Sequence, residues 1–63
     1  MIQIIVERWS QRDGSVDWLW SIWQDGERKQ MGGAHDDAGS AEMEARAACQ
    51  QSFGQLPDDV TVL

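Results

Sequence analysis

The chain has 63 residues, with eleven Asp and Glu against five Lys and Arg, and a formal net charge of −6. This length allows one small core and excludes a second one, so residues 1–63 are expected to form a single domain. The acidic balance argues against direct binding to nucleic acid or to an anionic membrane, since both attract clustered positive charge.

The chain has one cysteine, Cys49, and one histidine, His35. They exclude an internal disulfide and a Cys/His zinc site built from this chain alone, so oligomerisation is the remaining common way to stabilise so small a domain. We expect no cofactor. Residues 1–6 lack the basic flank and length of a targeting segment, and a free thiol suits a reducing compartment, so we expect a cytoplasmic protein without a membrane span.

Two segments, residues 2–9 and 16–24, alternate in hydrophobicity with the period of two that is typical of strands. Their even positions are apolar except at Arg8 and at the terminal Gln24, so the even face is predicted to be the core face. The odd positions also carry four large apolar residues, which are Ile5, Trp9, Leu19 and Trp23.

Turn residues predict how these strands pair. A three-residue loop with Gly14 at its left-handed position keeps even positions opposite even positions, and it pairs Val6 with Trp20. A two-residue turn at Asp25-Gly26 would then pair Trp23 with Arg28 in a third strand, about residues 27–33. The same register pairs Trp20 with Met31, so Met31 is expected in the core.

Residues 33–39 have the composition of a loop, and Ser40 is a good N-cap for a helix that ends near Phe53. Glu42 and Glu44 are expected in the first turns, where the helix dipole favours negative charge. Gly54 suits the position after the helix. One stripe of this helix carries small residues, namely Ala41, Ala45, Ala48, Cys49 and Ser52.

A helix with a small face can approach a sheet closely, and a sheet that bears Trp18 and Trp20 needs that room. Residues 60–63 can add a short strand parallel to the first one. The sequence therefore predicts an α+β fold with the element order βββαβ: an antiparallel three-stranded meander, one helix on one face, and the strand order 4-1-2-3. Which face of the last strand meets the core stays open.

Only His35-Asp36-Asp37 resembles a catalytic or metal-binding cluster. Adjacent residues in a loop rarely converge on one ion, so we favour a solvated loop whose Asp residues help to cap the helix. Cys49 lies on the predicted core stripe, where a thiol is inert. No phosphate-binding loop is present. We therefore expect no enzyme and no metal site.

One helix cannot cover both faces of the sheet, so the outer apolar residues are either exposed or covered by another chain. Exposed patches of this kind usually mark interfaces, and tryptophan is enriched among binding hot spots. This predicts a protein-binding module or a homodimer with a site at Ile5, Trp9, Leu19, Trp23 and Arg28. Alternatively, Trp9 and Trp23 lie under Arg28 as ordinary surface residues. Stacking of single-stranded nucleic acid on these aromatics would need a positive groove.

Several segments resemble short uncharacterised bacterial and phage proteins in which a Trp-x-Trp strand precedes an Asp/Asn-Gly turn, a Gly-containing loop and a Ser-capped, Ala-rich helix. The matching segments cover about half of the chain and are Trp18-Leu19-Trp20, Asp25-Gly26, Gly32-Gly33 and residues 40–48. The resemblance implies a phage or prophage origin and carries no established catalytic residues. Small acidic phage proteins include inhibitors of host defence systems, among them anti-CRISPR proteins.

Two further functions differ in class from a binding module. An acidic inhibitor that imitates nucleic acid and occupies a nucleic-acid-binding site would use Asp36, Asp37, Glu42, Glu44, Asp58 and Asp59. A small enzyme or metal protein would use His35.

Overall fold

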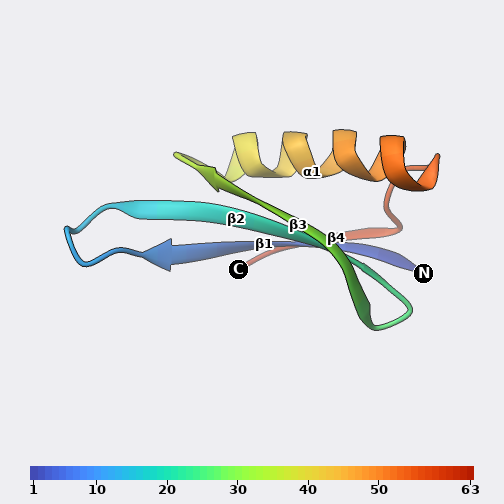
Figure 1. Cartoon of the computed structure of the whole chain (residues 1–63), viewed down its shortest axis with the longest axis horizontal. Coiled ribbons are helices and arrows are strands. Elements are labelled where there is room, and N and C mark those ends of the chain that lie inside the picture. The colour runs from blue at the N-terminus through green and yellow to red at the C-terminus, as the bar shows by residue number, and fades with distance from the viewer.

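A computed structural model describes residues 1–63 as one four-stranded sheet with a single helix on one of its faces (Figure 1). The elements are β1 (Ile2–Ser10), β2 (Val16–Gln24), β3 (Glu27–His35), α1 (Ala38–Phe53) and β4 (Asp59–Val62). The strand order is β3-β2-β1-β4, with β4 parallel to β1 and the other neighbours antiparallel. The predicted α+β fold and strand order are therefore confirmed.

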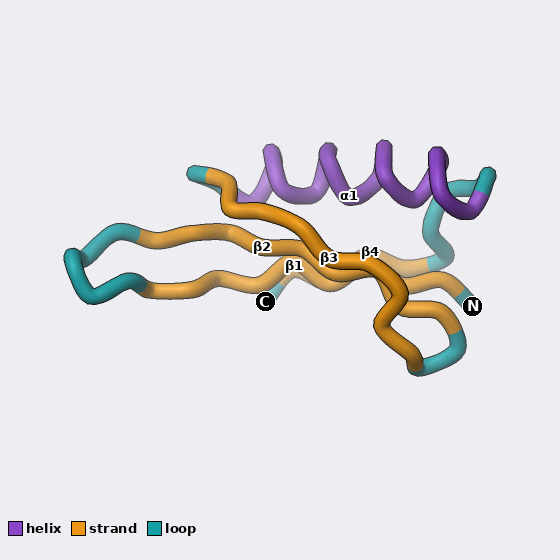
Figure 2. Tube along the Cα trace, viewed as in Figure 1, coloured by secondary structure: helices purple, strands orange, loops and turns teal.

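The hairpin of β1 and β2 has the predicted register, with Val6 opposite Trp20. Its three-residue loop is closed by the Gln11 N–H, which donates to the Ser15 carbonyl at 2.8 Å. Gly14 has a φ of 89°, a conformation that favours glycine. The tip of this hairpin extends past the end of α1 at which the helix begins (Figure 2).

The pairing of β2 with β3 starts as predicted, with Trp23 opposite Arg28, and then shifts by one residue. The shift lies between Trp23 and Ile22, where Lys29 is the extra residue of a β-bulge. Side chains that follow a bulge change faces, so Gly32 lies opposite Trp20 and Met31 lies opposite Ser21. The prediction that Met31 joins the core is wrong.

Gly32 makes room for the largest side chain of the core. A Cβ atom at this position would lie 2.5 Å from the Trp20 ring, so the indole occupies the space that a side chain would need. Beyond it β3 continues to His35, which lies opposite Trp18. The predicted loop over residues 33–39 is therefore wrong, since only residues 36–37 separate β3 from α1.

Helix α1 starts three residues earlier than predicted, because Asp37 and not Ser40 is its N-cap. The Asp37 carboxylate accepts a hydrogen bond from the Ser40 N–H at 2.7 Å, and the bonds from Ser40 lower the pKa of Asp37. Glu42 and Glu44 consequently lie beyond the first turn, contrary to expectation. The helix ends as predicted, with Gly54 in the left-handed conformation.

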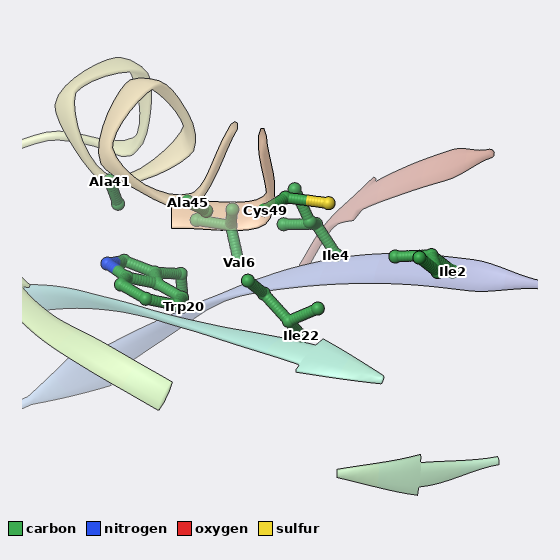
Figure 3. Packing of buried hydrophobic residues seen from close by; sticks show 8 residues of the cluster. All are labelled: Ile2, Ile4, Val6, Trp20, Ile22, Ala41, Ala45 and Cys49. Atoms are coloured by element: carbon green, nitrogen blue, oxygen red, sulfur yellow. The ribbon is translucent and has the colours of Figure 1, made fainter. Parts of the chain in front are cut away.

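The core lies between α1 and the even face of β1 and β2 (Figure 3). Its eight buried residues are Ile2, Ile4, Val6, Trp20, Ile22, Ala41, Ala45 and Cys49. Ala41, Ala45 and Cys49 confirm the small face of the helix, and burial raises the pKa of the Cys49 thiol. Trp18 is half-buried against this core.

Strand β4 places Val60 against the core, which decides between the two faces that the sequence left open. The Asp58 carboxylate accepts a hydrogen bond from the Ile2 N–H at 2.7 Å and so fixes the start of β4 beside β1. Helix α1 is too short and too polar to cross a membrane.

Candidate functional site

Helix α1 covers one face of the sheet, and the β2–β3 turn curves toward the opposite side (Figure 1). We call this opposite side the outer face. Cross-strand pairing arranges its side chains in rows. The first row contains Arg28, Trp23, Gln3 and Asp59, and the second contains Met31, Ser21, Ile5 and Thr61. Leu19 and Glu7 follow in the third row, and Asp17 and Trp9 in the fourth.

The register brings the five predicted site residues together on the outer face. Ile5, Leu19 and Trp23 are half-buried there by their neighbours within the sheet. Arg28 is exposed at the β3 edge, in the same row as Trp23. Trp9 is 53% exposed and belongs to the part of the β1–β2 hairpin near its tip. Ile5, Leu19, Trp23 and Trp9 thus form a strip along the two central strands, and Arg28 lies beside its Trp23 end.

Trp23 is held in place by a hydrogen bond along its own strand. Its indole N–H donates to the Ser21 hydroxyl at 2.9 Å, and Ser21 is only 7% exposed. The indole therefore extends along β2 toward Ser21. A side chain that is already ordered loses less entropy when it binds a partner, which suits Trp23 to an interface.

The structure adds Met31 to the outer face, where its side chain is 56% exposed in the row of Ile5. Sequence reasoning missed it because an unbroken register placed it on the other face. The one available signal was Gly32, since a residue without a side chain is what a strand beside Trp20 requires.

On the covered side of the sheet, a cluster of polar side chains joins α1 to β2 and β3. The Trp20 indole N–H donates to the Glu44 carboxylate at 2.9 Å, and the His35 imidazole bonds the same carboxylate oxygen. The Glu44 side chain is still 50% exposed, so it bonds Trp20 and His35 from the solvated edge of the helix. The bond from Trp20 and then the bond from His35 lower the pKa of Glu44.

This cluster predicts a stability that depends on pH. The folded state holds the pKa of Glu44 below its ordinary value of 4.5. The ionised Glu44 carboxylate therefore stabilises the fold fully above that value, and this stabilisation is lost as the pH falls through the lowered pKa. We expect the melting temperature of the wild-type protein to fall more steeply between about pH 5 and pH 3 than that of Glu44→Gln.

The matched control is Glu42→Gln, which removes a carboxylate that pairs with Arg46 on the surface of the same helix. Its melting temperature should follow the wild-type pH dependence closely. Identical pH profiles for the wild type and Glu44→Gln would contradict the assigned role of Glu44.

The structure separates the six residues of the alternative acidic site. Asp36 and Asp37 precede α1 and Asp58 and Asp59 follow it, and a helix of 16 residues is about 24 Å long. Most of these carboxylates also accept hydrogen bonds from the chain itself. The bonded ones are Asp37, Glu42, Glu44, Asp58 and Asp59.

The structure shows no pocket, and no group of three or more His, Cys, Asp or Glu side chains is placed to hold a metal ion. His35 bonds Glu44, while Asp37 caps α1, so the three residues of the His35-Asp36-Asp37 segment do not act as one cluster. Comparison with protein-family models, curated proteins and solved structures finds no match for this chain. Its function is therefore inferred from its own surface.

Proposed function

We propose that the chain is a non-enzymatic protein-interaction module that binds through the outer face, either to itself or to another protein. The supporting observation is that the apolar residues at odd positions of β1 and β2 share the one sheet face that α1 leaves bare. Contiguous apolar surface of this kind usually marks an interaction site, and tryptophan side chains supply much of the binding energy at such sites.

The charges on the outer face have the distribution expected of an interface. Arg28 and Asp59 stand at the two edges of the sheet, and Asp17 lies near the hairpin tip. Protein interfaces commonly have charged residues at the rim, and the outer face has this feature at its edges, although Glu7 also lies beside Leu19 at its centre. The proposed module is cytoplasmic and of phage or prophage origin, in line with the resemblance and the free thiol.

The acidic inhibitor is the less favoured candidate. Its carboxylates lie at both ends of α1 and most of them are engaged in hydrogen bonds within the fold. The two candidates differ in salt dependence: binding through acidic residues would weaken steeply as salt increases, whereas binding through the apolar outer face would keep most of its strength.

Leu19→Glu tests the proposed function, because it places a second carboxylate beside Glu7 at the centre of the outer face. Met43→Glu is the matched control: it introduces the same charge on the exposed side of α1, where Met43 is exposed. We expect Leu19→Glu to weaken association at least tenfold and Met43→Glu to leave it unchanged, with both variants folded by circular dichroism.

Association is measured in two ways. Sedimentation velocity of the purified protein reports binding to itself, and affinity capture from the cells that encode it reports binding to other proteins. If both variants behaved like the wild type in both measurements, the outer face would not be the binding surface and the proposed function would be wrong.

A further inference from the structure

We propose that the occupant of the outer face is a second copy of this chain. The two sheets pack face to face about a twofold axis parallel to the strands, so that Arg28 of each copy meets Asp59 of the other. This inference rests on the proposed function, since it names the partner of the same surface.

The supporting observation is the charge arrangement of the first row. Arg28 pairs with Trp23, Trp23 pairs with Gln3, and Gln3 pairs with Asp59, so one row crosses the whole sheet. The row has a basic residue at the β3 edge and an acidic residue at the β4 edge, and both are exposed. Its two ends are therefore opposite in charge.

A twofold axis that lies between the two sheets and parallel to the strands exchanges the two edges of the sheet. Each row keeps its position along the strand direction, so it faces the same row of the other copy. Strand β3 of one copy then lies over β4 of the other, and each Arg28 lies opposite an Asp59. The contact occurs twice because a twofold interface uses the same patch on both copies. Pairs of Arg with carboxylate form strong, directional hydrogen bonds, so they would define the orientation of the dimer.

The same rotation places β2 of one copy over β1 of the other. Ile5 then lies over the small Ser21, and the two Trp23 indoles come side by side in the centre. Packed sheets stand about 10 Å apart, a distance that interdigitated side chains of this size fill. Trp9 lies over Asp17, whose carboxylate can accept the indole N–H.

The available area is that of a small interface. Strands stand about 4.8 Å apart; β1, β2 and β3 have nine residues and are about 30 Å long, whereas the four residues of β4 span about 13 Å. Each copy therefore offers about 500 Å², and the total for two copies lies at the low end of specific protein interfaces. We expect a reversible dimer with a dissociation constant in the micromolar range.

Charge reversal tests this arrangement by sedimentation velocity at about 0.15 M salt, which screens the repulsion between two acidic chains. Arg28→Asp and Asp59→Arg are each expected to weaken homodimerisation at least tenfold, because each creates two contacts between like charges. An equimolar mixture of these two variants is expected to dimerise like the wild type, because every contact then joins opposite charges. The double variant Arg28→Asp/Asp59→Arg should regain homodimerisation for the same reason.

Arg46→Asp is the control, since it reverses an exposed charge on α1 and should leave dimerisation unchanged. A wild-type chain that stays monomeric up to about 1 mM would overturn the second copy as occupant, whereas the proposed function would still be decided by the capture experiment with Leu19→Glu. A dimer that Leu19→Glu dissociates but that all charge variants leave intact would overturn the strand-parallel axis. A dimer that resists Leu19→Glu as well would overturn the second copy as occupant of the outer face, and the capture experiment would again decide the proposed function.

Discussion

Replacement of Trp20 by alanine is expected to lower the free energy of unfolding by about 3–5 kcal/mol. Trp20 is 4% exposed and packs between β3 and α1, and its indole N–H donates to Glu44. The substitution removes the largest buried side chain and leaves a cavity beside Gly32. A domain of this length has a total stability of about 3–9 kcal/mol, so Trp20→Ala is expected to lose at least about a third of it.

Trp9→Ala is the matched control, because it removes the same side chain from a site that is 53% exposed. Urea unfolding followed by circular dichroism should show a loss of less than about 1 kcal/mol for this variant. Trp9→Ala should instead weaken association through the outer face. Equal losses of stability in the two variants would contradict the assignment of one tryptophan to the core and the other to the binding surface.

Gly32→Ala is expected to destabilise the protein by about 1–3 kcal/mol, because it overpacks a filled region. The added methyl group would lie 2.5 Å from the Trp20 ring, so the indole or β3 must move. Displacement of the indole would also disturb its hydrogen bond to Glu44. The measurement is again urea unfolding, and a stability equal to that of the wild type would show that Trp20 does not lie against Gly32.

Two comparisons make this prediction specific. Gly39→Ala is the same substitution in the first turn of α1, where the added methyl group would meet only the Asp37 carboxylate, at 3.3 Å, so it should cost clearly less than Gly32→Ala. In a Trp20→Leu background the ring is absent, and Gly32→Ala should then cost clearly less. If Gly32→Ala lowered the free energy of unfolding equally in that background, its effect would not arise from contact with the Trp20 ring.

Much of this fold could be predicted because its main signals are local. The alternation of residues 2–9 and 16–24 assigns each side chain to a face, and loop length together with Gly14 determines the register of the first hairpin. The small residues Ala41, Ala45 and Cys49 likewise predicted the helix face that meets Trp20. The outer positions Leu19 and Trp23 followed from the same alternation.

The remaining features depend on contacts between distant residues. The bulge at Lys29 exists because Gly32, and not Met31, fits beneath Trp20, and no local pattern marks it. Asp37 and Ser40 are both good N-cap residues, and the sequence could not rank them. The position of Glu44 beside Trp20 required the packing of α1 on β2.

The four indole N–H resonances in a ¹⁵N–¹H spectrum report separately on the two faces of the sheet, because two tryptophans lie on each face. The resonances of Trp9 and Trp23 are expected to shift as the protein concentration is raised and the dimer forms. The resonances of Trp20, which is buried under α1, and of Trp18, which packs against the core, should stay in place. Shifts confined to Trp18 and Trp20, or no shift of Trp9 and Trp23, would show that the outer face does not form the dimer.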